Sequence, residues 1–226
     1  RFTRNKHAIG QFPTRAIRFC REYEDLTLDD VSHLAVADNP KRYLKRLPWS
    51  VRNSLFNTNG LLETIGSLRN SVFQGILVRA AFPRQRIKRG LADFEYESLP
   101  EIHFIDHHRA HAASAFYYSG FNDANVVTVD GSGEYDCTVL WSVERGRLTR
   151  QKTYETPNSV GKFYGTVTRF LGYRMNNGET KIMGLAPYGK ENQEIRTKLL
   201  DVISYGGGDY DVSRITDTGN PISKLE

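Results

Sequence analysis

The residues best suited to chemistry in this chain are histidines, because three of its six fall inside the segment 106–111, which reads DHHRAH. The residues before this segment are apolar, as at the end of a buried strand, and those after it are good helix formers without glycine or proline. If a helix begins near residue 106, His107 and His111 lie four residues apart on one helix face, where both imidazoles can reach one ion. The spacing therefore predicts part of a metal site, with His108 pointing to another face.

A third candidate ligand follows the next predicted strand. The β-branched run Val126–Val129 leads into Asp130, and Gly131 and Gly133 after it permit a tight turn. Two imidazoles and a carboxylate suit iron, zinc or manganese and leave positions open for water, phosphate or substrate. The alternative is that the histidines only cap a helix and make hydrogen bonds around its start. A zinc-protease motif is excluded, since His108 stands where the glutamate of H-E-x-x-H would be.

The elements around Asp130 indicate a fold. A strand, an Asp-Gly-x-Gly turn and two further strands follow one another, and small residues in such a turn let backbone amides approach phosphates, as in sugar kinases and actin-like ATPases. This order opens an actin-like half-domain, of the ribonuclease-H-like α/β class. The strands are predicted at 126–129, 135–143 and 148–155, with a turn at 144–146 and then an amphipathic helix at 160–171 capped by Asn158 and Ser159.

Glycines and two charged residues near these elements are candidate contacts for an adenylate. Gly161 lies in the first turn of the predicted helix, where free amide groups can meet an anion. The stretch Asn176–Gly189 is predicted to be a glycine-punctuated connection near the same end of the sheet, carrying an acid and a base. The alternative is that its glycines and proline only make turns. The candidate contacts are Gly131, Gly133, Gly161, Glu179 and Lys181.

The rest of the chain is expected to form the elements that support the candidate site. We expect a helix at Pro13–Glu24, a strand at Val31–Ala37, a basic and largely helical insertion over about residues 39–100, and a helix at Asn192–Ile203. The tail Gly206–Glu226 is rich in glycine, aspartate and serine and is predicted to be loop.

Composition narrows the class of partner. The net charge of +5 and the pI of about 9.2 favour small anions over nucleic acid, because the basic residues are scattered and the aromatic residues follow strand and helix patterns. Cys20 and Cys137 are far apart, so neither a disulfide framework nor a zinc knot is expected, and a cytoplasmic location fits. No apolar run reaches membrane-span length, so no membrane association is expected.

Four segments in this order closely resemble the O-carbamoyltransferases of the nodulation protein U, cephamycin and tobramycin carbamoyltransferase type. They read DHHRAHAASAFYYSGF, VVTVDGSGEYDCTVL, NSVGKFYGTVTRFLGY and NNGETKIMGLAPYGK. The start, RFTRNKHAIGQFPTRAIRFC, also resembles the family's segment just after its first strands. The resemblance covers most of residues 1–190, and several motifs in register argue against a chance match.

The resemblance implies an actin-like domain similar to the universal tRNA threonylcarbamoyladenosine-forming protein, with a divalent metal, expected to be iron, and an ATP-derived adenylate. In such enzymes carbamoyl phosphate and ATP yield a carbamoyl-adenylate, whose carbamoyl group passes to a hydroxyl of a small-molecule acceptor. By the motif, His107 and His111 match the histidine ligands and Asp130 matches the strand-end ligand. His108 is a candidate general base, with a capping role as the favoured alternative.

Against this family, the chain is expected to be a fragment truncated at both ends and inactive alone, without the first hairpin, a fourth metal ligand and the YrdC-like domain. We expect residues 1–122 to form a first half-domain that contains the insertion, and 123–226 to begin a second. The alternatives are a tRNA threonylcarbamoyl transfer protein and a non-catalytic nucleotide-binding module, and a homo-oligomer stays open. A sugar kinase is disfavoured, because kinases of that fold hold Mg²⁺ with carboxylates.

Overall fold

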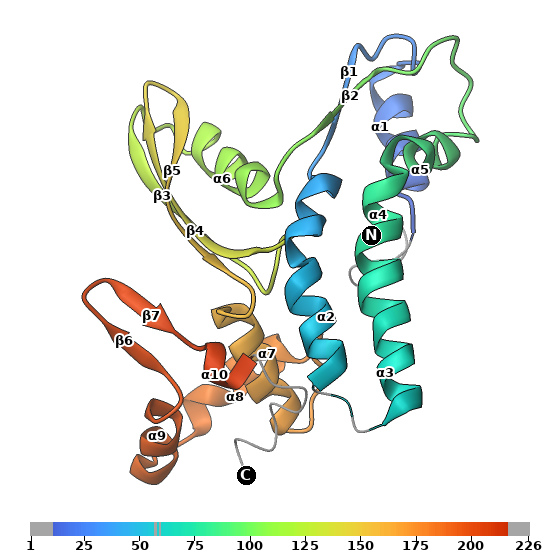
Figure 1. Ribbon diagram of the computed structural model, residues 1–226. Helices are drawn as coiled ribbons and strands as arrows, with labels where there is room; N and C mark the ends of the chain where they lie inside the picture. Colours follow the sequence, from blue (N-terminus) through green and yellow to red (C-terminus); the bar gives the residue numbers. More distant parts are fainter. Residues whose placement is uncertain (1–10, 57, 59, 217–226) are drawn as a thin grey trace.

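The computed structural model describes residues 11–56, 58 and 60–216, which form a mixed α/β structure with three separate sheets (Figure 1). The strands are β1 (His33–Val36), β2 (Glu101–Phe104), β3 (Ala124–Val129), β4 (Asp136–Glu144), β5 (Arg147–Glu155), β6 (Ser204–Gly206) and β7 (Asp209–Asp211). The helices are α1 (Thr14–Glu24), α2 (Leu47–Phe56), α3 (Leu61–Ser67), α4 (Val78–Ala81), α5 (Pro83–Gly90), α6 (His107–Tyr117), α7 (Val160–Phe170), α8 (Glu179–Leu185), α9 (Gln193–Leu200) and α10 (Ser213–Thr216), with η1 (Pro40–Arg46), η2 (Leu68–Leu77) and η3 (Ala186–Tyr188) between them.

The first sheet is the parallel pair β1 and β2. Alternate side chains of both strands join a core with residues of α1, α5 and the loops around them, which shows why these short apolar runs become strands. The buried members of this core are Leu28, Ile87, Leu91, Phe94 and Ile102, with Leu34, Val36 and Phe104 packed against them. The predicted helix at 13–24 and strand at 31–37 are thereby confirmed as α1 and β1.

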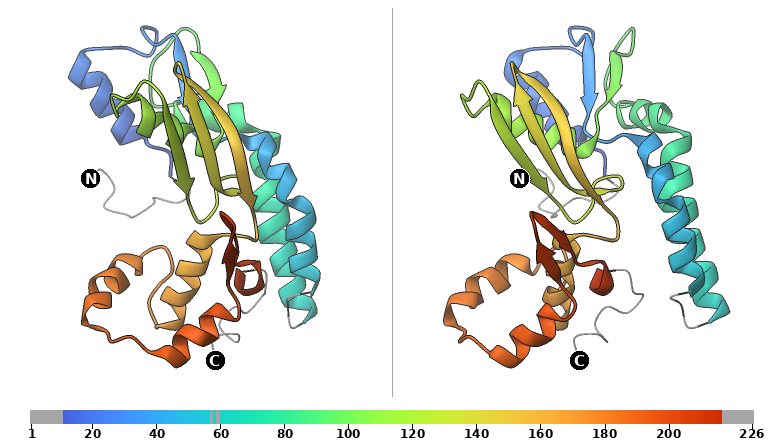
Figure 2. Two further views of the ribbon diagram at one scale, coloured as in Figure 1. Left: turned by 90° about the vertical axis from the view of Figure 1, so that its left-hand side faces the viewer. Right: turned by 60° about the vertical axis from the view of Figure 1, so that its left-hand side comes forward.

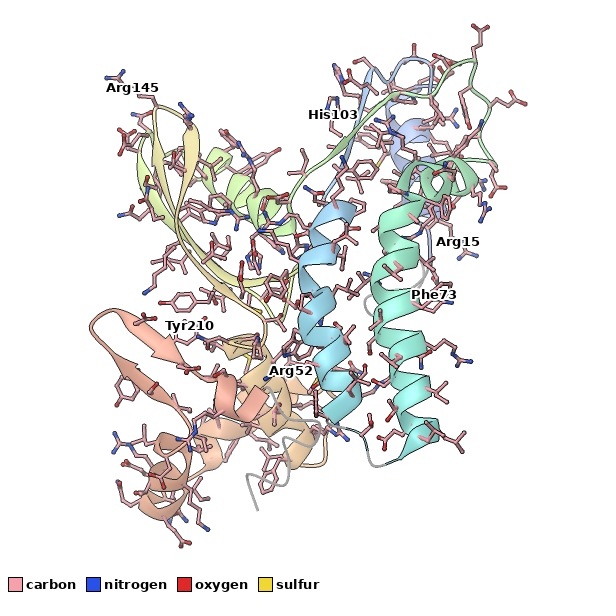
Figure 3. All side chains as sticks on the ribbon, in the orientation of Figure 1. Arg15, Arg52, Phe73, His103, Arg145 and Tyr210 are labelled. Carbon is pink, nitrogen blue, oxygen red and sulfur yellow. The ribbon has the colours of Figure 1, made fainter. Side chains whose placement is uncertain are left out.

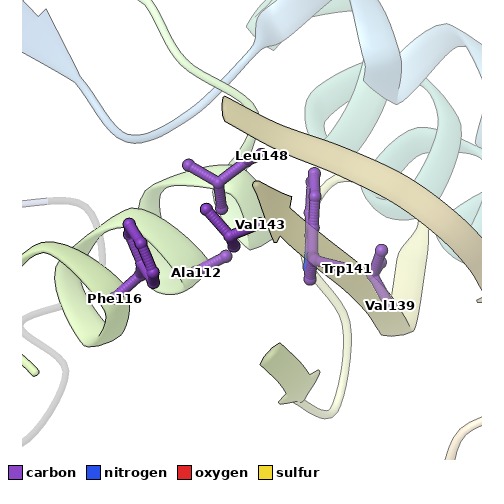
Figure 4. Close-up of a cluster of buried hydrophobic side chains, with 6 residues drawn as sticks. All are labelled: Ala112, Phe116, Val139, Trp141, Val143 and Leu148. Carbon is purple, nitrogen blue, oxygen red and sulfur yellow. The ribbon is translucent and has the colours of Figure 1, made fainter. Parts of the chain in front are cut away.

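The second sheet is antiparallel in the order β3-β4-β5, as the strand and turn pattern predicted. Arg145 and Gly146 both have positive φ, 50° and 74°, which makes the tight turn between β4 and β5. Helix α6 covers one face of this sheet, and its Ala112 and Phe116 meet apolar side chains of β4 and β5 (Figure 4). Each large apolar side chain buried there stabilises the fold by about 1.5–3 kcal/mol. This packing holds the helix that carries the histidines.

The insertion is largely helical, as predicted. Helix α2 runs beside the rod formed by α3, η2 and α4 in each view (Figures 1 and 2). The guanidinium of Arg79 lies 5.2 Å from the ring centroid of Tyr43 and donates to its hydroxyl, which joins the rod to η1. None of the described helices is long and apolar enough to cross a membrane.

Two predictions about the last third of the chain are wrong. The stretch 176–189 is helix α8 followed by η3, with Gly178 just before α8, Gly184 inside it and Gly189 just after η3, so its glycines do not prevent a helical run. The tail begins as the β6-β7 hairpin and α10, and only 217–226 of the predicted loop lie outside the described residues. The hairpin is held by Tyr210, which is labelled in Figure 3. Its ring stacks on Tyr154 at 4.2 Å between ring centroids, and its hydroxyl donates to Thr138.

Candidate metal centre

The start of α6 is fixed by a carboxylate from a different element. The first N–H groups of a helix have no partner inside the helix, and the side chain of Asp106 at the N-cap makes no capping bond. Glu134, on the loop between β3 and β4, instead accepts the backbone N–H of His107 at 2.9 Å and that of Asn39 at 2.7 Å. Glu134 is 1% exposed. It therefore links α6 and the entry to the insertion through one buried oxygen.

Two arginines hold two aspartates next to this start. Arg42 donates to Asp106 at 3.1 Å and to Asp136 at 2.6 Å, and Arg150 also donates to both carboxylates. Burial would raise the pKa of Asp136, but the hydrogen bonds and positive charges of Arg150 and Arg42 outweigh it and hold this pKa below its ordinary value. The network joins the insertion, α6, β4 and β5, and thus fixes the frame around the histidines.

His107, His111 and Asp130 lie together, as the helix spacing and the strand end predicted. His107 Nε2 is 2.8 Å from Asp130 Oδ2 and 3.0 Å from His111 Nε2, and His111 Nε2 is 3.8 Å from the same carboxylate oxygen. The three side chains are between 30% and 54% exposed, so a ligand can reach them from solvent. Metal binding by these residues stays a prediction.

The donor set of these three residues fits a divalent transition metal. In a tetrahedral site with bonds of about 2.0–2.1 Å, neighbouring ligand atoms lie about 3.3 Å apart, and the three separations of 2.8, 3.0 and 3.8 Å scatter around that value. Without an ion, His107 Nε2 carries at most one proton, so it can donate a hydrogen bond to only one of its two neighbours, Asp130 or His111. The hydrogen bond with Asp130 raises the pKa of His107 and lowers that of Asp130.

The turn after Asp130 packs directly on the start of α7. A side-chain carbon at Gly161 would lie 2.6 Å from the backbone nitrogen of Gly131 and 2.7 Å from the carbonyl of Asp130, so only glycine fits there. Ser159 donates to the Gly131 carbonyl at 2.8 Å and accepts the N–H of Lys162, which confirms it as the cap of α7. Helix α7 and the strand-end carboxylate are thus held in one unit.

The other predicted adenylate contacts differ in their surroundings. A carbon added at Gly131 would meet no atom within 4 Å, so this glycine borders open space. At Gly133 the same carbon would lie 3.1 Å from His107 and His108, so this glycine serves packing in the structure. Glu179 accepts the backbone N–H of Asn176, and Lys181 lies 6.0 Å from the ring centroid of Tyr173. Within the described residues, no hydrogen bond or ion pair joins either side chain to the three candidate metal ligands.

His108 is part of the packing beneath the candidate site. It is 1% exposed, its Nδ1 is 2.9 Å from Thr128 Oγ1, and its Nε2 is 3.0 Å from the Asp136 carbonyl. Because a carbonyl only accepts, Nε2 carries the proton, and burial lowers the pKa of the ring. Both nitrogens are engaged inside the protein, so this geometry gives no support to a general-base role.

Two cationic side chains that the sequence analysis did not predict as site residues lie close to the ring of Trp49. Lys162 Nζ is 5.2 Å and the Arg46 guanidinium carbon is 5.8 Å from its ring centroid. Burial, and then the charge of Arg46, lower the pKa of Lys162 to about 8. Within the described part of the chain, neither cation forms an ion pair, and the polar neighbour of Lys162 Nζ is Thr156 Oγ1 at 3.4 Å. The two residues are far apart in the sequence, so only the fold brings them together.

The chain also matches known proteins. A family model described as carbamoyltransferase N-terminus matches residues 1–216. The nodulation protein NolNO of Sinorhizobium fredii is 29% identical over 96% of this chain and 29% of its own length, and NolO of Bradyrhizobium diazoefficiens is 36% identical over 49% of this chain and 20% of its own length. An uncharacterized Synechocystis protein is 34% identical over 91% of this chain and 33% of its own length. The chain thus spans about a third or less of these curated relatives. This match over nearly the whole sequence shows that the chain belongs to the carbamoyltransferase amino-terminal family.

Proposed function

We propose that this chain is the amino-terminal part of a metal- and ATP-dependent O-carbamoyltransferase. The observation that carries the proposal is the convergence of His107, His111 and Asp130 in a chain of the carbamoyltransferase family. In this proposal carbamoyl phosphate and ATP yield a carbamoyl-adenylate, and a hydroxyl of a small acceptor then takes the carbamoyl group. The proposal includes an actin-like fold, in which residues 1–122 and 123–226 belong to two half-domains.

The three ligands would hold the ion with positions open toward solvent. When bound, the ion would supply positive charge next to the phosphate or carbamoyl oxygens, where negative charge develops during acyl transfer. The residues around the three ligands would contribute by holding those ligands in fixed positions. Glu134 and the network of Arg42 and Arg150 fix the start of α6, and Gly161 fixes the turn that carries Asp130. Electrostatic stabilisation depends on such groups being placed before the reaction begins.

The pair Arg46 and Lys162 supports an anionic substrate. Burial and then the charge of Arg46 disfavour the protonated Lys162, which has no ion-pair partner among the described residues, and a bound anion beside it would offset that cost. Lys162 is one residue from Gly161, whose backbone touches the Asp130 turn. ATP and carbamoyl phosphate both carry several negative charges. We assign this pair to a phosphate group of one of them.

The direct test is an assay of the whole protein that contains this chain. Carbamoyl phosphate, ATP and a panel of hydroxylated acceptors are supplied, and pyrophosphate release and the mass of a carbamoylated product are followed. The wild type should form product, His107→Ala with His111→Ala should lose at least about 99% of the rate, and the exposed control Glu144→Gln should keep it. Full activity in the double variant would contradict the role of the metal ligands. Absence of product from the wild type across a broad panel would contradict carbamoyl transfer.

A further inference from the structure

The parallel strands β1 and β2 present two different faces. Their apolar side chains point into the core shared with α1 and α5, so the alternating ones lie on the opposite face. In the register of the pair, His33 lies opposite Glu101 and Ala35 lies opposite His103. This second face thus gathers two histidines and a glutamate within a few residues of paired strand, although His33 lies 70 residues before His103 in the sequence.

The three polar side chains converge on one point. His33 Nδ1 is 3.0 Å from His103 Nε2, and the two ring centroids are 5.1 Å apart. Glu101 places one oxygen 3.6 Å from His33 Nδ1 and the other 3.7 Å from His103 Nε2. His103 projects from β2 where it runs beside β1 (Figure 3). The glutamate therefore faces both imidazoles at once.

We propose that His33, Glu101 and His103 form a second binding site for a divalent transition metal of the zinc class. Two imidazole nitrogens and a carboxylate oxygen are the ligands such ions prefer, whereas magnesium and calcium select oxygen alone. Ligand atoms of a tetrahedral zinc site lie about 3.3 Å apart. The two imidazole nitrogens are 3.0 Å apart, each lies 3.6 or 3.7 Å from a different oxygen of Glu101, and one ligand atom from each of the three residues lies within 4.8 Å of the others. The Glu101 oxygens lie slightly too far from the imidazole nitrogens for direct hydrogen bonds, at distances that suit ligands of one shared ion.

The site is open to solvent and lies on a defined scaffold. The three side chains are 64%, 66% and 42% exposed, so water or an external ligand completes the coordination. Ala35, the residue paired with His103, has only a methyl group, which leaves room for the His33 ring to lean along the strand toward His103. The ligands come from a different sheet than Asp130 and from a different element than the helix that carries His107 and His111. The second site is therefore independent of the proposed transferase site.

The test counts bound zinc ions on tag-free protein by calorimetric titration and by metal analysis after dialysis. The background variant is His107→Ala with His111→Ala, which leaves the β1-β2 ligands as the remaining cluster of candidate metal ligands among the described residues. We expect this variant to bind one equivalent and the further change His33→Ala with His103→Ala to abolish that binding. Glu101→Gln should weaken it at least about tenfold, since a charged ligand is lost. The exposed control Glu95→Gln should leave it unchanged.

Two outcomes would overturn the second site. One is a background variant that binds no zinc although its circular dichroism spectrum and melting temperature match those of the wild type. The other is zinc binding that persists at the same affinity after His33→Ala with His103→Ala. Because the His107 and His111 ligands are absent from all these variants, neither outcome bears on the proposed transferase function.

Discussion

Glu134 accepts the backbone N–H of His107 at 2.9 Å, so a buried carboxylate from one loop caps the helix that presents the candidate metal ligands. The same oxygen accepts the N–H of Asn39, at the beginning of the insertion. Among the described residues, no hydrogen bond or ion pair joins the Glu134 side chain to the His107 imidazole or to Asp130, so the carboxylate positions His107 through its backbone. Glu134 is a positioning residue for the candidate metal centre.

Replacing Glu134 should separate its capping role from its charge. Glu134→Ala leaves two backbone N–H groups without a partner, so we expect the free energy of unfolding to fall by about 2 kcal/mol or more and metal affinity at the His107 site to fall about tenfold. Glu134→Gln keeps an acceptor oxygen and should lose clearly less of both. Urea unfolding and metal titration check this. Equal losses in the two variants would show that the charge matters and the cap does not.

Gly161→Ala should disturb the turn that carries Asp130. The added carbon would lie 2.6 Å from the Gly131 nitrogen, and because the obstacle is backbone, the helix or the turn must shift. We expect a loss of about 1–3 kcal/mol in stability and weaker metal binding. Gly184→Ala is the matched control, since its added carbon meets no atom within 4 Å and alanine favours helices. Thermal unfolding of both variants should place Gly184→Ala at or above the wild type, and a lower melting temperature there than in Gly161→Ala would refute the packing argument.

Lys162→Met should stabilise the ligand-free protein and weaken anion binding. Burial lowers the pKa of Lys162 from 10.5 to about 8, so its protonation disfavours the folded state. Below about pH 8 the full cost of roughly 1–3 kcal/mol is present, and it disappears as the pH rises toward 10.5, where the unfolded chain also loses the proton. The stability advantage of the methionine variant should therefore shrink over that pH range in urea unfolding.

The binding of ATP checks the other half of the Lys162 prediction. Affinity measured by calorimetry at pH 7 should fall about tenfold in Lys162→Met, because a charge-assisted contact to phosphate is lost. The exposed Lys190→Met serves as control and should bind ATP like the wild type. Unchanged ATP affinity in Lys162→Met, with the expected gain in stability, would show that this pair of cations does not meet the nucleotide.

The sequence predicted those parts of the site that depend on local periodicity. His107 and His111 share a helix face because four residues make about one turn, and Asp130 ends a strand whose alternation is visible in the sequence. Pairing across elements was not predictable in the same way. Glu134, Arg42 and Arg150 reach the start of α6 only through the packing of an insertion, a loop and a strand. The β1-β2 register that joins His33 to His103 likewise has no signature in either strand alone.

The two wrong predictions have different physical causes. Glycines in the stretch 176–189 suggested a connection, but Gly178 precedes α8 and Gly184 sits inside it with open space around it, so the helix forms despite the glycine penalty of about 1 kcal/mol. The tail after Gly206 pairs as a hairpin because Tyr210 contacts Tyr154 and Thr138 on the β3-β4-β5 sheet. Neither partner is near in the sequence.

Removing the metal ligands of α6 should lower the number of bound ions by one. Wild-type protein is expected to hold one divalent ion at His107, His111 and Asp130 in addition to the ion proposed at β1 and β2. His107→Ala with His111→Ala should lose the first, and His33→Ala with His103→Ala should keep it.

An ion that binds only the folded state stabilises it by about 2.7 kcal/mol at a hundredfold excess over the dissociation constant. Added metal should therefore raise the melting temperature of the His33 and His103 variant, and a chelator should reverse the rise. Metal analysis and thermal unfolding of both double variants measure these effects side by side. A melting temperature that does not respond to metal while His107, His111 and Asp130 are intact would contradict the site on which the proposed transferase function depends.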